Sequence, residues 1–283
     1  MRLPTHIPYK NGEGGVKVGL EPIEISEWLE IDELFTSEIE QKKELYKHSF
    51  ESIYQEHVDS KDAQLELFNT LSKHIDTYHN DHTFPKEGSS FLHKASLMVQ
   101  EDLVLMIPDD NKFFLGAASL CSPSNWSLTE KFNKSLLNLH EYVPSYEKTI
   151  GSRVDNFFTK LPPDRVFQRF NWSIYEDPSL YQPARSKAVI ERSRAIDSSN
   201  AGESLFLRVE RQTVRKLPKT LSVVFTIRVH VDPLYSIEND LSLMRDLNLA
   251  LDNLSKEMKI YKSIDQIESP LKSWLNNKIK YLS

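Results

Sequence analysis

The stretch SLFLRVERQTVRKLPKTLSVVFTIRVHV, residues 204–231, decides the fold. Its two parts, 204–214 and 222–231, are rich in β-branched and aromatic residues, which favour strands. Two strands joined by so short a connection predict an antiparallel pair.

Alternation divides each of these strands into two faces, because successive side chains of a strand point to opposite sides. In the first strand Arg208, Glu210 and Gln212 share a polar face, and the other face is mainly apolar. In the second strand Arg228 and His230 lie on the polar face. A solvated outer face of a sheet explains this pattern. The polar wall of a pocket explains it equally well, since arginine binds anions there, and the residues alone leave both interpretations open.

Three further runs have the same strand-like character: VQEDLVLMI (99–107), KFFLGAASLC (112–121) and VFQRFNWSI (166–174). Helical patterns occupy about 26–78 and about 236–280, with interruptions expected near Tyr261 and Pro270. Five central strands with helices at both ends predict an α+β fold with a mainly antiparallel sheet of about five strands.

Shorter helices are expected between the strands. The sequence SLTE at 127–130 has the spacing of a capping box, and a second helix is expected over 146–161, where two prolines end it. We expect an arm over 1–20 and one domain over 21–283. Within that domain 21–95 is helical, 96–232 forms the sheet core and 233–283 is helical again.

Composition excludes several classes of protein. The net charge of -6 argues against nucleic acid as a partner. A single cysteine, Cys121, excludes an internal disulfide or an iron–sulfur cluster held by this chain alone. Without a long apolar run or a secretory leader, the sequence predicts a cytoplasmic protein that does not enter a membrane. The dinucleotide, P-loop, nucleophile-elbow and zinc-protease motifs do not occur.

Two residues are unusual for their positions. Glu101 shares a strand face with Val99 and Leu103, where a carboxylate is costly unless it is paired or neutralised. It is either a buried partner of an arginine, a one-residue error in strand phase, a site acid whose pKa is raised, or a carboxylate that meets a cationic ligand. His140, in LLNLHEYVPSY, is either a structural histidine or a metal ligand.

Seven stretches, taken in order, resemble the haem-dependent oxidative N-demethylase family. They are GLEPIEISEWLE (19–30), QEDLVLM (100–106), LCSPSNWSLTEK (120–131), LHEYVPSYEKTIGSRVDNFF (139–158), FNWSI (170–174), LRVERQTVRKLPKT (207–220) and FTIRVHVDPL (225–234). The resemblance implies a PAS-like sheet that binds haem b. It also implies oxidative removal of a methyl group from a small secondary amine such as dimethylamine, which yields a primary amine and formaldehyde. Dioxygen would be the oxidant, with electrons from separate flavin and iron–sulfur reductase subunits.

The resemblance also assigns residues. His140 matches the family's histidine before the Val-Pro pair and is the expected iron ligand, with His230 as the reserve candidate and a Cys121 thiolate as the alternative. Asp102 is a weaker candidate for contacting the amine. The expected catalytic residues are Arg208, Glu210, Arg228 and Glu101, and the expected cofactor-binding residues are His140, Gln212, Trp172 and His230. A haem-binding sensor without turnover, or a scaffold without haem, remains the alternative function.

Overall fold

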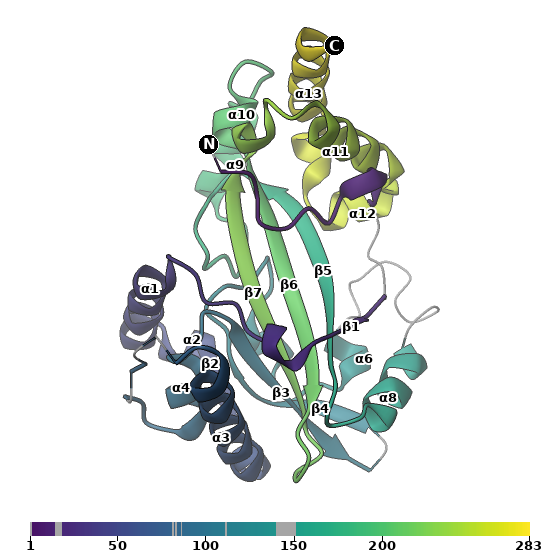
Figure 1. Ribbon diagram of the computed structural model, residues 1–283. Helices are drawn as coiled ribbons and strands as arrows, with labels where there is room; N and C mark the ends of the chain where they lie inside the picture. The colour runs from purple at the N-terminus through teal and green to yellow at the C-terminus, as the bar shows by residue number, and fades with distance from the viewer. Residues whose placement is uncertain are drawn as a thin grey trace.

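A seven-stranded antiparallel sheet forms the centre of the computed structural model, which describes residues 2–14, 19–80, 82, 84–85, 87–110, 112–139 and 151–283 (Figure 1). Its strands are β1 (Glu21–Ile23), β2 (Tyr54–Glu56), β3 (Asp102–Asp109), β4 (Lys112–Ser119), β5 (Val166–Tyr175), β6 (Phe206–Lys216) and β7 (Val223–Pro233). The order across the sheet is β1-β5-β6-β7-β3-β4-β2. The α+β class and the antiparallel sheet are therefore confirmed.

The five predicted strands correspond to β3–β7, and the two strands that the sequence did not reveal lie at the edges. Both β1 and β2 contain three residues, which is too short for an alternating pattern to stand out. They pair with β5 and β4, respectively, and widen the sheet from about five strands to seven.

The register between β6 and β7 assigns side chains to the two faces of the sheet. Arg208 lies opposite Val231, Glu210 opposite Val229, and Arg211 opposite Arg228. Directly paired residues point to the same side. We call the side that carries Arg208, Glu210 and Gln212 the Glu210 face, and the side that carries Arg211, Arg228 and His230 the Arg228 face.

Helices from both ends of the chain cover the Arg228 face. The N-terminal helices are α1 (Phe35–His48), α2 (Phe50–Ile53), α3 (Lys61–Tyr78) and α4 (Phe91–Ser96), and the C-terminal helices are α11 (Leu241–Asn253), α12 (Lys256–Tyr261) and α13 (Glu268–Leu282). In one cluster Leu67 and Leu71 of α3 pack against Leu105 of β3. In another, helices α11 and α13 pack on Leu207 and Val209 of β6. The two groups lie near opposite ends of the long strands (Figure 1).

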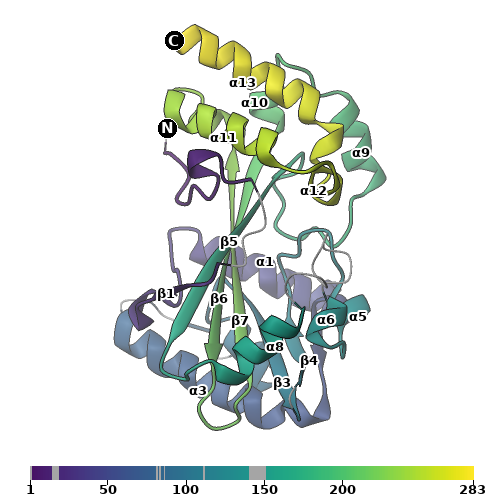
Figure 2. The ribbon, with the colours of Figure 1, turned by 90° about the vertical axis from the view of Figure 1, so that its right-hand side faces the viewer.

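Shorter helices lie between the strands in sequence: α5 (Leu128–Lys131), α6 (Leu136–Leu139), α8 (Gly151–Lys160), α9 (Lys187–Arg194) and α10 (Ala201–Ser204). Short 3-10 turns occur at Lys10–Gly12, Ile25–Glu27, Val58–Ser60, Leu234–Ile237 and Ile264–Gln266. A third cluster joins Leu128 of α5 and Phe158 of α8 to Val104, Met106, Val214 and Val223 of the Glu210 face. In Figure 2, α5, α6 and α8 lie together beside the strands.

The helix predictions are confirmed in part. Ser127 precedes α5, but its side chain makes no cap hydrogen bond and α5 has four residues. Helix α8 begins at Gly151, and the predicted residues 146–150 lie outside the described ones. The C-terminal interruption at Tyr261 is present, whereas Pro270 lies in the first turn of α13, where a helix does not need its N–H. None of the described helices has the length and apolar character of a membrane span.

Candidate functional site

The expected site residues separate onto two faces of the sheet. Arg208, Glu210 and Gln212 lie on the Glu210 face, whereas Arg228 and His230 lie on the other. The expectation that Arg228 joins Arg208 in one polar wall is therefore wrong, because the β6–β7 register offsets the two polar patterns by one residue. The roles assigned to these residues remain predictions.

Glu210 is the centre of a buried network of polar side chains. Its carboxylate accepts hydrogen bonds from Ser124 Oγ, from Asn171 Nδ2 at 3.3 Å and from Gln212 Nε2 at 2.7 Å. Gln212 Oε1 in turn accepts a hydrogen bond from Arg169 Nε at 2.6 Å. These side chains lie on one face because β5 pairs with β6 so that Asn171 is opposite Glu210 and Arg169 is opposite Gln212.

Lys262 joins this network from the turn after α12, and sequence reasoning missed it. Its side chain is buried, and Nζ donates to Asn171 Oδ1 at 2.7 Å and to the backbone oxygen of Trp172. Burial lowers the pKa of Lys262 to about 8, although the charge of Glu210 opposes that effect. The amide of Asn171 thus bridges a carboxylate and a lysine whose pKa is lowered by burial. We call Arg169, Asn171, Glu210, Gln212 and Lys262 the Glu210 network.

Arg208 holds two loops together. It is 2% exposed, and its guanidinium donates to Ser124 Oγ and to backbone oxygens in both loops, those of Ser122, Pro123, Ser179 and Leu180. All of these acceptors belong to the segments 122–124 and 179–180. The structure therefore places Arg208 where it positions the loops next to Glu210.

Asp102 binds the backbone of the loop that contains Ser122. Its carboxylate accepts the N–H groups of Cys121 at 2.7 Å and Ser122 at 2.8 Å. Burial raises the pKa of Asp102 to about 6 despite these bonds. Burial and the nearby Asp102 raise the pKa of the Cys121 thiol to about 12, which disfavours the thiolate that iron ligation requires.

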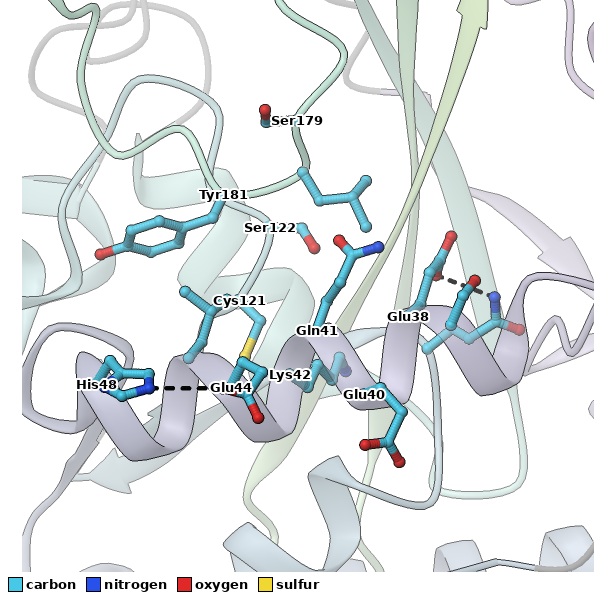
Figure 3. Close-up of a pocket in the computed structure, with 14 residues that line it drawn as sticks. Glu38, Glu40, Gln41, Lys42, Glu44, His48, Cys121, Ser122, Ser179 and Tyr181 are labelled. Carbon is cyan, nitrogen blue, oxygen red and sulfur yellow. Dashed lines mark hydrogen bonds and ion pairs between the residues drawn. The ribbon is translucent and has the colours of Figure 1, made fainter.

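A pocket of about 510 Å³ lies between α1 and the loops that Arg208 holds (Figure 3). Cys121, Ser122 and Tyr181 face the helix across it, and Gln41 and Glu44 line the opposite side. None of the expected catalytic residues lines this pocket. Arg208 nevertheless shapes it, because its bonds fix the loops that form one wall.

Partly buried aromatic side chains adjoin the Glu210 network on the same face. Phe167 lies two residues before Arg169 on β5, and Phe225 of β7 pairs with Val214 of β6. Phe157 of α8 contacts Phe167 with ring centroids 5.5 Å apart. The partly buried members around the third cluster are Leu20, Trp126, Phe132, Leu139, Phe157, Phe167 and Phe225. The Glu210 face thus combines an apolar aromatic surface with polar and cationic groups. His140 lies outside the described residues, and Leu139 packs against this cluster.

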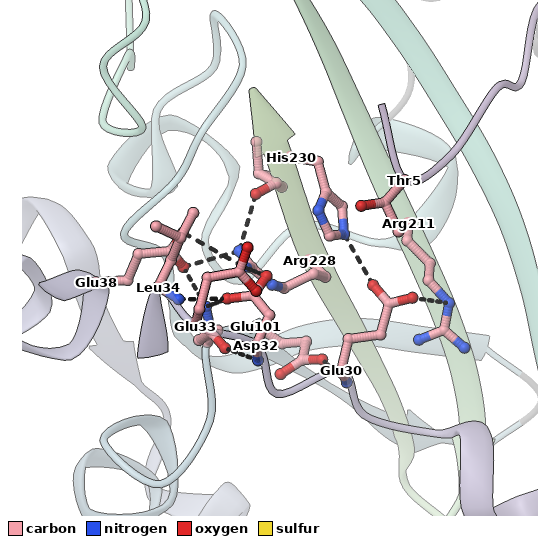
Figure 4. A network of polar contacts seen from close by, with 12 residues as sticks. Thr5, Glu30, Asp32, Glu33, Leu34, Glu38, Glu101, Arg211, Arg228 and His230 are labelled. Carbon is pink, nitrogen blue, oxygen red and sulfur yellow. Dashed lines mark hydrogen bonds and ion pairs between the residues drawn. The ribbon is translucent and has the colours of Figure 1, made fainter. Parts of the chain in front are cut away.

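On the opposite face Arg228 is paired with acids. Its guanidinium donates to Glu38 Oε2 at 2.8 Å and Asp32 Oδ2 at 2.7 Å. Glu101 is also buried here, beside Arg228, and one of its oxygens accepts the backbone N–H of Glu30 at 2.8 Å (Figure 4). Burial raises the pKa of Glu101. The carboxylate therefore lies in a compact charged cluster and not on the Glu210 face.

The remaining expected residues also lie on the Arg228 face. His230 Nε2 is 2.8 Å from Glu30 Oε2, and His6 Nε2 is 2.8 Å from Glu30 Oε1. Trp172 is buried in the second hydrophobic cluster, where its indole contacts the Tyr9 ring at a centroid distance of 5.8 Å. The structure thus brings Arg208, Glu210 and Gln212 together and separates them from Arg228, Glu101, His230 and Trp172.

Comparison with known proteins gives one family. The family described as haem-dependent oxidative N-demethylase, alpha subunit-like, matches residues 76–272. This range covers more than two thirds of the chain and contains β3–β7 together with every residue of the Glu210 network. It includes six of the seven stretches quoted above, and only 19–30 precedes it. The chain therefore belongs to the haem-dependent oxidative N-demethylase, alpha subunit-like family.

Proposed function

We propose that this chain is the haem-binding subunit of a monooxygenase that removes a methyl group from a small secondary amine such as dimethylamine. The observation that carries the proposal is the buried Glu210 network beside an aromatic surface, in a chain of this family. We propose further that 21–283 forms one domain around a PAS-like core. Primary amine and formaldehyde are the proposed products, and dioxygen supplies the oxygen atoms of formaldehyde and water.

The described residues fit haem b by their chemistry. A porphyrin is a large apolar plane with carboxylates at one edge, so it requires apolar contacts and cationic groups side by side. The Glu210 face offers Phe157, Phe167 and Phe225 next to Arg169. These residues would contact the ring and its propionates. Bound haem supplies the iron centre at which dioxygen is reduced and the methyl group is oxidised.

His140 is the proposed iron ligand. The support is its position in the family motif and its place in the chain directly after Leu139, which packs against the aromatic cluster. His230, the reserve candidate, lies on the Arg228 face, opposite to the aromatic cluster. That arrangement favours His140 over His230.

Glu210 is the proposed binding group for the amine. A small alkylammonium ion carries one positive charge, and a buried carboxylate attracts it strongly because screening by water is weak there. The protonation of Lys262 changes the strength of this attraction. Below its pKa of about 8 the lysine compensates the charge of Glu210 through Asn171, and above that pH it does not. KM for the amine should therefore fall as the pH rises through about 8.

Electrons must come from a partner. The sequence has one cysteine, which cannot hold an iron–sulfur cluster alone, and it has no dinucleotide fingerprint. The family description as an alpha subunit agrees with further subunits. We propose flavin and iron–sulfur reductase subunits as the donors.

The test is formaldehyde release from dimethylamine by the haem-loaded protein, with a reductase supplied. Glu210→Gln should raise KM for the amine by about tenfold, which corresponds to about 1.4 kcal/mol of lost attraction. Glu203→Gln, an exposed glutamate on α10, is the matched control and should leave KM unchanged. Haem binding without formaldehyde release would favour the sensor function. An active Glu210→Gln variant with normal KM would remove Glu210 from amine binding.

A further inference from the structure

Three side chains with metal-ligating atoms meet on the Arg228 face, away from the Glu210 network. They are His6 of the N-terminal segment, Glu30 of the segment before α1, and His230 of β7. Their ligand atoms all lie within 4.8 Å of one another. We propose that His6, Glu30 and His230 form a binding site for a divalent transition-metal ion, with Zn²⁺ as the best-fitting ion.

The spacing of the ligand atoms suits such an ion. At metal–ligand bonds of about 2.0–2.1 Å, two ligands of a tetrahedral zinc ion lie roughly 3.3 Å apart. Here each imidazole Nε2 is 2.8 Å from an oxygen of Glu30, and no pair of the three ligand atoms exceeds 4.8 Å. The spacing that zinc requires lies between these two distances, so small side-chain movements would allow all three atoms to bind one ion. Two histidines and one glutamate are also the ligand set of zinc sites that keep an open position.

The site is held in place before any ion binds. Arg211 donates to the backbone oxygens of Glu27 and Trp28, which fixes the segment that carries Glu30. The His6 ring packs on Phe170 with a centroid distance of 4.8 Å. Such outer contacts orient ligands and increase metal affinity.

The charged groups around the site have opposite effects on the binding of a cation. Arg211 Nε lies 3.5 Å from Glu30 Oε1, which disfavours a second cation, and Figure 4 shows Glu30 between Arg211 and His230. Asp232, two residues after His230 on the same face, interacts electrostatically with both imidazoles and offsets that charge. The side chains of His6, Glu30 and His230 are 20%, 24% and 11% exposed, so an ion can reach them from solvent.

The experiment is a calorimetric titration of the intact chain with ZnCl₂, combined with the zinc-dependent increase in its unfolding midpoint. Wild type should bind about one ion. His230→Ala and His6→Ala should each weaken binding by more than about 100-fold, because loss of a ligand costs more than loss of its supporting contacts. His48→Ala is the control, since this histidine is 76% exposed and is not among the grouped ligands.

The zinc measurements do not depend on haem binding. Unfolding midpoints measured without zinc show whether a variant is folded, and Glu30→Gln, which keeps the side-chain volume, provides a second folded test. Equal zinc affinity in wild type, His230→Ala and Glu30→Gln would overturn the proposal, as would absence of zinc binding by wild type. The Soret band should be the same in wild type and His6→Ala, so failure of the zinc site leaves the haem proposal untouched.

Discussion

Replacing Lys262 by methionine tests the charge balance of the Glu210 network. Burial lowers the pKa of this lysine from 10.5 to about 8. At about 1.4 kcal/mol per unit of pKa shift, keeping the lysine charged lowers the free energy of unfolding by roughly 3 kcal/mol. The hydrogen bonds to Asn171 Oδ1 and Trp172 O offset part of that cost in the wild type. Methionine removes both the charge and these bonds.

The pH dependence separates the two effects. The folded-state pKa lies below the unfolded value, so the unfolded chain takes up the proton first as the pH falls from 10.5 to about 8. The cost is therefore fully present below about pH 8 and is relieved as the pH rises through 10.5. The free energy of unfolding of wild type, minus that of Lys262→Met, should rise by about 3 kcal/mol across this window.

The assay is urea unfolding at intervals of pH, with wild type and variant measured in parallel. Ionisation of tyrosines affects both proteins equally and cancels in the difference. Lys256→Met, at the exposed start of α12, should give a flat difference. A flat difference for Lys262→Met as well would refute the reasoning, because it would show that Lys262 keeps an ordinary pKa in the folded protein.

Two further substitutions test the packing of the scaffold. Arg228→Met leaves Glu38 buried without its cation and removes the ion pair with Asp32, so the free energy of unfolding should fall by about 3–5 kcal/mol in urea titrations. Gly116→Ala places a methyl group 2.2 Å from Cγ1 of Ile107, and overpacking of this kind should cost about 1–3 kcal/mol, measured as a lower unfolding midpoint.

Each of these has a compensating variant. Adding Glu38→Leu to Arg228→Met removes the buried carboxylate that has lost its cation, and much of the free energy of unfolding should be recovered. In an Ile107→Ala background, which lacks the Cγ1 atom that the new methyl group meets, Gly116→Ala should lower the unfolding midpoint by less than it does in the wild type. Single variants as stable as wild type would contradict the contacts described for these residues.

The sequence predicts the strands well because their patterns are local. Alternation over ten residues identifies β6 and β7, and it correctly groups Arg208 with Glu210 and Gln212. It does not predict how two strands align. A one-residue difference in register moved Arg228 from the face of Arg208 to the opposite one, and no local pattern encodes that choice.

The missed part of the site depends on contacts between distant segments. Lys262 follows a helix in a polar turn and looks like an ordinary surface lysine, yet it is buried against residues of β5. His6 and His230 are more than two hundred residues apart and meet only through Glu30. Glu101 was recognised as unusual because a carboxylate in an apolar run is visible in the sequence. The structure buries it near Arg228, and the choice among its interpretations stays a prediction.

The visible absorption spectrum of the haem-supplemented chain tests the central claim, that a haem binds on the Glu210 face with His140 as its iron ligand. We predict a Soret band with about one haem per chain, lost or shifted in His140→Ala and unchanged in His230→Ala. A wild-type chain that takes up no haem, or a His140→Ala spectrum identical to that of wild type, would contradict the account.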